Sequence, residues 1–173
     1  MKNEAIEVLM NRRAIRKYKS EQIDDAALKT ILDAGTYAPT ARGMQRPVIV
    51  AVQNKAKRDE VAALNAAVMG GTGDPYYGAP TIILVLAPDD EFGPLDASAV
   101  IDNMLNAAYA CGLGSCWIHR ARAMFDTSEG KALLRAWGLD ESLRGVASMA
   151  LGYADCEQPS PAPRKENYYT IIK

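Results

Sequence analysis

Histidine and cysteine are scarce in this sequence, which has one histidine, His119, and three cysteines. With a single histidine, histidine-based triads and His-rich metal sites lack their parts, and we expect no metal. The cysteines, at 111, 116 and 156, are odd in number and form no Cys-x-x-Cys pair, which indicates neither a disulfide framework nor a zinc ribbon. Free thiols suit a reducing cytosol, so we expect a cytoplasmic protein. Enzymatic chemistry, if there is any, would therefore belong to a cofactor.

An excess of charge of one sign and long apolar runs are also missing. The net charge is −1, so no overall field favours nucleic acid or an anionic membrane. Aromatic residues make up only 7%, which further disfavours a nucleic-acid module. The longest strongly apolar stretch, 81–87, is too short to span a bilayer, and the N-terminal residues are not followed by the long apolar run of a secretory signal. We expect neither a membrane nor a nucleic-acid partner.

The length of 173 residues fits one domain, 1–173. Apolar periodicity and capping residues predict helices at 3–11, from Asp24 or Asp25 to Gly35, at 55–69, at 94–111, and from a cap at one of residues 126–128 to Gly138. Apolar and β-branched runs predict strands at 48–53, 81–86, 115–118 and 146–151. This alternation of helices and short strands indicates an α/β or α+β layer fold. The proline-containing tail, 154–173, has too little apolar content to fold alone, so we expect it to pack on this subunit or on a partner.

Cations gather in two places in the otherwise nearly neutral chain. Five of the eight residues in 12–19 are basic, and Arg12 and Arg16 are four positions apart, a spacing that lets both converge on one anion. By composition alone, such a run is more often a solvated surface. Arg164 and Lys165 form a second pair behind the prolines of the tail, where they either close on a phosphate or remain in solvent.

Two further segments have the features of ligand-binding loops. The loop 38–47 joins a helix to a strand and offers Thr40 and backbone amides as donors, while Gln45 both donates and accepts, as a heteroaromatic edge requires. The segment 112–119 contains glycines that permit a flat ligand to approach the backbone. Alternatively, the loop is an ordinary connection, Trp117 and Ile118 are part of the core, and His119 is an incidental surface residue.

In this order, six segments of the chain resemble the nitroreductase-like flavoprotein family: Arg12-Arg13-x-x-Arg16-x-Tyr18, Ala38 to Gln45, Tyr77 to Pro80, Gly112 to Ile118, Leu151 to Tyr153, and Pro163 to Lys165. The resemblance covers nearly the whole chain. It implies an α+β fold, a three-layer α/β/α sandwich with a mixed, mostly antiparallel central sheet. It also implies a homodimer that exchanges a C-terminal extension, with 154–173 packing on the partner subunit.

The resemblance further implies FMN sites between the subunits, with the chemistry carried by FMN and no catalytic side chain. Basic residues at both ends of the chain would hold the phosphate, the loop of the other subunit would line the ribityl and ring groups, and the segment after the glycines would pack near the central ring. The implied cofactor-binding residues are Arg12, Arg13, Ala14, Arg16, Pro39, Thr40, Ala41, Gln45, Asn65, Trp117, Ile118, His119, Arg164 and Lys165.

The implied activity is transfer of reducing equivalents from NADH or NADPH to a nitroaromatic, quinone or flavin acceptor by a ping-pong mechanism. The chain departs from the family pattern at Gly43, where many members have asparagine, at Arg46 to Val48, and in the short glycine-rich loop 70–76. These regions select the acceptor, so its identity stays open. The alternatives are an FMN enzyme of another reaction type in the same family, and a flavin-binding or redox-sensing module with little turnover.

Overall fold

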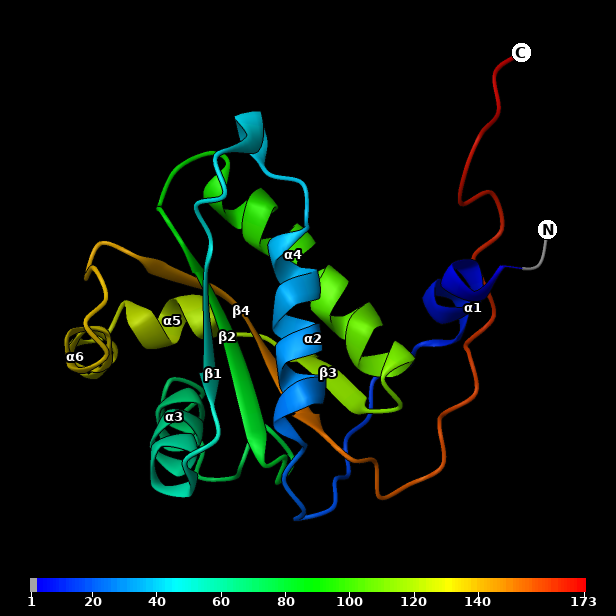
Figure 1. The fold of residues 1–173 in the computed structure, drawn as a ribbon. Helices are drawn as coiled ribbons and strands as arrows, with labels where there is room; N and C mark the ends of the chain where they lie inside the picture. Colours follow the sequence, from blue (N-terminus) through cyan, green and yellow to red (C-terminus); the bar gives the residue numbers. More distant parts are fainter. Residues whose placement is uncertain (1–2) are drawn as a thin grey trace.

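The computed structural model describes residues 3–173 and contains the helices and strands that the sequence predicts (Figure 1). The order along the chain is α1 (Glu4–Asn11), α2 (Asp25–Thr36), the 3-10 helix η1 (Ala41–Gly43), β1 (Val48–Val52), α3 (Lys55–Ala67), β2 (Thr81–Ala87), α4 (Gly93–Ala110), β3 (Gly114–Ile118), α5 (Ala121–Phe125), α6 (Ser128–Ala136) and β4 (Arg144–Gly152). Only the short elements η1 and α5 were not predicted. Within residues 3–173, every helix is too short or too polar to span a bilayer.

Side-chain caps explain where several helices begin. Asp24 accepts a hydrogen bond from the amide of Ala27 at the start of α2, and Thr127 accepts one from Gly130 at the start of α6. The sequence left the cap of α2 open between Asp24 and Asp25, and the cap of α6 open among residues 126–128. The structure identifies Asp24 and Thr127 as the caps. Helix α4 has no side-chain cap at Phe92; instead, a carboxylate oxygen of Asp90 accepts from the amides of Phe92 and Gly93.

The four strands form an antiparallel sheet in the order β1-β2-β4-β3. All seven residues of β2 are buried, because helices cover both faces of this central strand. Its side chains alternate: Ile82 and Leu84 belong to one core cluster, and Ile83 and Val85 to the other. The resemblance implies a mixed, mostly antiparallel sheet. Among the described residues the strands pair only in antiparallel fashion, and the one parallel pairing is an isolated bridge between Ala14 and Ser115.

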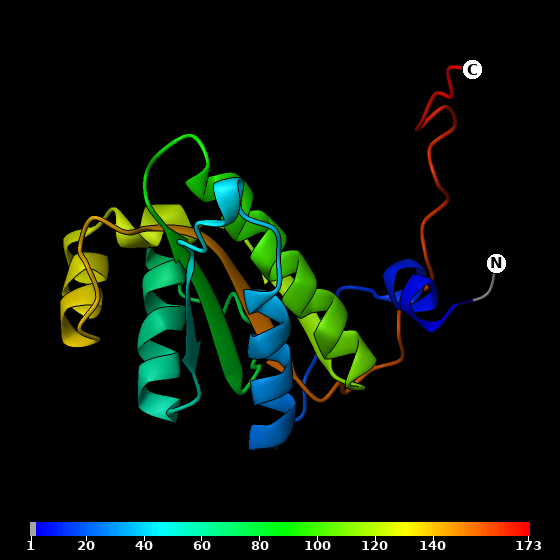
Figure 2. The same ribbon diagram turned by 45° about the horizontal axis from the view of Figure 1, so that its top comes forward.

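The helices make the outer layers of an α/β/α sandwich, as predicted. Helices α2 and α4 cover one face of the sheet, and α3, α5 and α6 cover the other (Figures 1 and 2). Helix α1 lies on one side of the sandwich, near α4, and the later part of the tail runs away from the sandwich on the same side (Figures 1 and 2). Helix α1 has no buried residue, and its apolar side chains Ile6, Leu9 and Met10 are exposed. The single protomer therefore leaves apolar surface uncovered on these segments.

Gly145 of β4 allows close packing of the sheet on α5. A Cβ atom there would lie 2.2 Å from the carbonyl oxygen of Ala121 and 2.8 Å from Cδ2 of Phe125. Because one of these atoms belongs to the backbone, we expect Gly145→Ala to lower the free energy of unfolding by about 2–3 kcal/mol, as overpacking does in tight cores. Gly73→Ala is the control, since nothing lies within 4 Å of the Cβ it would add. Chemical denaturation of both variants tests this, and equal stabilities would contradict it.

Candidate functional site

The basic segment after α1 is fixed along the edge of the sheet. The amide of Ile15 donates to the carbonyl oxygen of Ser115 at 2.9 Å, and Tyr18 forms a bridge with Ala154. Ile15 and Tyr18 are buried, and the Tyr18 hydroxyl donates to the Ile15 carbonyl oxygen at 2.6 Å. Arg16, between these two anchors, is exposed. The segment is therefore not a freely solvated charge run, because its backbone position is determined by the sheet.

Arg12 and Arg16 lie near the same side chain of β3. Burial raises the pKa of the Cys116 thiol, and the positive charges of Arg16 and Arg12 act on that pKa in the opposite direction. Neither arginine forms an ion pair with a carboxylate of residues 3–173, whereas the neighbouring Lys17 lies 2.9 Å from Asp155. Two guanidinium groups that have no carboxylate partner and whose charges both act on Cys116 suit a phosphate.

Arg13 has a different environment from its two neighbours. Its Nη1 donates to the carbonyl oxygens of Met10 at 2.8 Å and of Arg12 at 2.7 Å, so the side chain closes the end of α1. The adjacent Ala14 brings no polar side chain, and it forms the bridge to Ser115. Contacts of Arg13 and Ala14 with a cofactor stay predictions.

The loop 39–45 is anchored on the start of α4. A carboxylate oxygen of the buried Asp96 accepts from the amide of Ala41 at 2.8 Å, and the hydroxyl of Thr40 accepts from the amide of Gln45 at 3.0 Å. Gln45 has a φ of 51°, and its side chain and Pro39 are exposed. Asp96 was not among the predicted site residues, since nothing local in the sequence relates it to position 41.

In one protomer this loop does not meet the basic segment. In Figure 1 the turn η1 lies at the top of the view, whereas α1 lies at the right, on the other side of α4. The tail cations do not meet Arg16 either. Gln158 donates to the carbonyl oxygen of Asn11 at 2.8 Å, and beyond it the tail runs away from the sandwich (Figures 1 and 2). Arg164 and Lys165 are exposed there. The predicted site residues thus fall into separate groups in the single chain.

A buried polar network fixes the turn that follows β3. Asn65 of α3 is 0% exposed, and its Nδ2 donates to the carbonyl oxygen of His119 at 3.2 Å and to the hydroxyl of Tyr76 at 3.3 Å. Tyr76 donates to Ser148 at 3.0 Å, and Ser148 donates to the carbonyl oxygen of Ile118 at 3.0 Å. Burial raises the pKa of Tyr76 to about 12, so its hydroxyl keeps the proton that it donates. This network holds the backbone at 118–119 rigidly.

Asn65 was predicted to reach a flavin, and in this protomer its amide is engaged with the turn at 119–120. A direct contact with a cofactor stays a prediction. Tyr76 and Ser148 were not predicted to belong to the site. Tyr76 directly precedes the Tyr77 to Pro80 segment, which is the one sequence signal that could have drawn attention to it.

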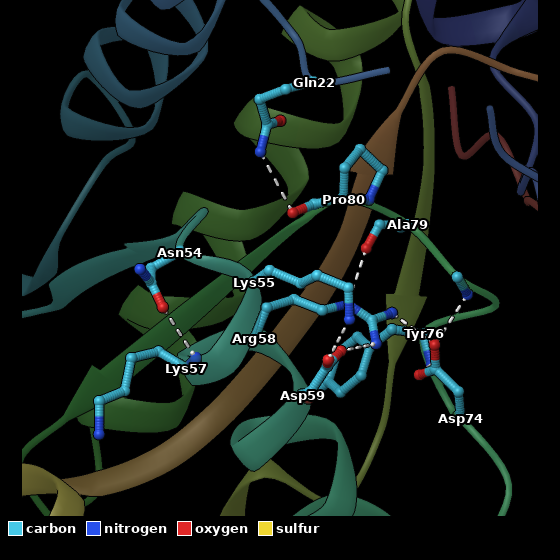
Figure 3. Close-up of polar contacts among 11 residues, drawn as sticks. Gln22, Asn54, Lys55, Lys57, Arg58, Asp59, Asp74, Tyr76, Ala79 and Pro80 are labelled. Atoms are coloured by element: carbon cyan, nitrogen blue, oxygen red, sulfur yellow. Dashed lines mark hydrogen bonds and ion pairs between the residues drawn. The ribbon is translucent and has the colours of Figure 1, made fainter. Parts of the chain in front are cut away.

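A cavity of about 410 Å³ lies between this turn and the loop after α3. Trp117, whose side chain is 38% exposed, forms part of its wall. The opposite wall is held by Arg58, which donates from Nη2 to Asp74 at 2.5 Å and from Nε to the carbonyl oxygen of Ala79 at 2.9 Å (Figure 3). A cavity lined by apolar side chains and a few polar groups at a fixed turn is typical of a small-molecule site.

The comparisons with known proteins agree on one family. The model of the Nitroreductase family matches residues 9–73 and 68–153. An NADPH-flavin oxidoreductase of Vibrio harveyi is 30% identical over 174 residues, which cover 94% of this chain and 70% of the relative. The crystal structure of a nitroreductase with bound FMN from Bacteroides fragilis is 28% identical, with a TM-score of 0.89 over 99% of this chain and 100% of that one. A nitroreductase with bound FMN from Desulfitobacterium hafniense, 23% identical, has the same fold with a TM-score of 0.90 over the full length of both chains.

Proposed function

The chain belongs to the nitroreductase family, and from this premise we propose that it is an FMN-dependent oxidoreductase. It transfers reducing equivalents from NADH or NADPH to a nitroaromatic, quinone or flavin acceptor in a ping-pong cycle. The NADPH-flavin oxidoreductase of Vibrio harveyi and the FMN-bound nitroreductase of Bacteroides fragilis support this proposal. FMN, when bound, supplies the chemistry by accepting a hydride from the nucleotide and returning the electrons to the acceptor.

The observation that carries the proposal is the pair of unpaired arginines beside β3. Arg12 and Arg16 have no carboxylate partner within residues 3–173, and both influence the thiol of Cys116. A phosphate bears nearly two negative charges and accepts several charge-assisted hydrogen bonds, so these residues fit the FMN phosphate. Trp117 to His119 would hold the ring system, with the turn kept in place by Asn65.

In this proposal the protein works as a homodimer, and each subunit completes the FMN site of the other. The partner's Thr40 and the partner's Gln45 would line the ribityl and ring groups, together with the adjacent Pro39 and Ala41 positions. The tail, through Arg164 and Lys165, would complete the phosphate clamp. Exposed apolar side chains on α1 and in the tail support this arrangement, since they gain cover only against a second subunit. All three cysteines are free, which supports a cytoplasmic location.

The test is a stopped-flow measurement on the purified protein. The visible spectrum should show a bound flavin, and denaturant should release it as FMN. Mixing with NADH or NADPH without oxygen should bleach that flavin, and adding a quinone or nitroaromatic should restore it over many cycles. Bleaching by neither nucleotide would sink the proposal. A single reduction with no turnover would favour the redox-sensing alternative.

A further inference from the structure

Arg120 is a cation of the cavity wall that has no acidic partner. It lies at the end of the turn after β3 and lines the 410 Å³ cavity together with Trp117 and His119. No carboxylate of residues 3–173 lies within ion-pair distance of its guanidinium group, whereas other arginines of the sandwich have such partners: Arg46, Arg58, Arg122, Arg135 and Arg144. A partly buried arginine that no carboxylate neutralises is available to pair with an anion from outside the chain.

The side chain is held in place rather than loosely solvated. Arg120 has a φ of 79°, a left-handed conformation that is rare for a residue with a side chain. Its Nε donates to Oδ1 of the fully buried Asn65 at 3.3 Å, and Asn65 is itself tied to Tyr76 and to the carbonyl oxygen of His119. A guanidinium group bound through Nε keeps its two Nη groups for a ligand. The buried network therefore orients Arg120.

The remaining charge in the cavity is already compensated. Asp74 is the only carboxylate among the residues of the wall, and it pairs with Arg58, whose Nη2 lies 2.5 Å from its Oδ2. The same carboxylate also accepts from the amides of Tyr76 and Gly78 (Figure 3 shows the Arg58–Asp74 side of this arrangement). With Asp74 engaged in these contacts, the cavity carries a net positive charge at Arg120.

We propose that Arg120 recognises an anionic group, a carboxylate or a phosphate, on the small molecule that enters this cavity. This inference rests on the proposed function, because it places the flavin against Trp117 to His119 and the reacting molecule beside it. The planar guanidinium group matches a carboxylate or a phosphate through two parallel hydrogen bonds. Apolar wall residues such as Met69 and Pro75 suit an aromatic ring of the same molecule. The anion comes either from an acceptor with a carboxylate or from the phosphate that distinguishes NADPH from NADH.

The first experiment measures binding without turnover. Benzoate and benzyl alcohol, which differ in charge and not in their ring, are titrated into the purified protein by calorimetry. We expect Arg120→Gln to weaken benzoate binding about 10-fold to 100-fold, the contribution of one charge-assisted pair, with benzyl alcohol unchanged. Arg122→Gln is the matched control. It removes the same charge two residues away, from an exposed side chain that faces Asp89 and Asp126 outside the cavity.

The second experiment identifies the source of the anion. Steady-state kinetics compare 4-nitrobenzoate with its methyl ester, and stopped-flow reduction compares NADPH with NADH. If Arg120→Gln lowers kcat/KM for 4-nitrobenzoate and not for the ester, the anion is the carboxylate of the acceptor. If it slows reduction by NADPH and not by NADH, the anion is the phosphate of the donor. Either result supports the proposal.

Three results would overturn it: equal effects on the charged and neutral members of both pairs, no effect on any of them, or loss of FMN from Arg120→Gln, which would make Arg120 a cofactor ligand. Circular dichroism of the variants checks that each stays folded, and Arg120→Lys, which keeps the charge, should restore part of the affinity for benzoate. A wild-type protein that neither nucleotide bleaches would refute the proposed function alone, since the calorimetric comparison needs no turnover.

Discussion

We expect Arg16→Ala to remove FMN from the protein while the chain stays folded. Arg16 is exposed between the buried anchors Ile15 and Tyr18, and its guanidinium group has no ion-pair partner within residues 3–173. Its loss should therefore cost the fold little, while the proposed FMN phosphate would lose one charge-assisted contact. We expect the Kd for FMN to rise about 10-fold to 100-fold, with the midpoint of chemical denaturation of the flavin-free protein unchanged.

The measurement is the ratio of flavin to protein after purification, followed by titration with FMN. Arg135→Ala is the control. Arg135 is an exposed arginine of α6 that pairs with Glu141, and it does not belong to the proposed site. This control should retain the full flavin content. An Arg16→Ala protein that purifies with stoichiometric FMN would show that the phosphate lies elsewhere.

We expect deletion of residues 160–173 to dissociate the proposed dimer and to release the cofactor at the same time. The side chains of Tyr168, Tyr169, Ile171 and Ile172 are between 68% and 88% exposed in the protomer, so they contribute nothing to its own core. Burying them against a partner would stabilise the dimer, since each large apolar side chain contributes about 1.5–3 kcal/mol when fully buried. Analytical ultracentrifugation measures the loss of the dimer, and FMN fluorescence measures the loss of cofactor.

A double substitution separates the two effects of the tail. Arg164→Ala with Lys165→Ala removes the tail cations and leaves its apolar residues in place, so it should weaken FMN binding and keep the dimer. The deletion should instead lose both. A stable monomer that still holds FMN after deletion would refute a site shared between subunits, and it would place every cofactor contact within one chain.

Local interactions explain which parts of the fold are evident in the sequence. The caps Asp24 and Thr127 act on amides within a few residues of themselves, and the apolar run of β2 reports burial on both faces. The short helix α5 has no such signal. Its N-cap position, Arg120, lies in the left-handed region and makes no side-chain cap, so the turn there is imposed by contacts with distant residues.

The sequence by itself determined the helices and strands other than η1 and α5, and the layer fold, and it pointed to the basic, loop and glycine segments of the proposed site, because each of these features depends on residues close together in the chain. Only the tertiary structure decided how Asn65, Tyr76, Arg120 and Ser148 meet, since these four residues lie on α3, β4 and two separate loops and are linked by hydrogen bonds across the interior. It also showed that Arg120 is left without a carboxylate while Asp74 has Arg58. Charge pairing depends on distances in space, and a linear pattern of acidic and basic residues contains no such distances.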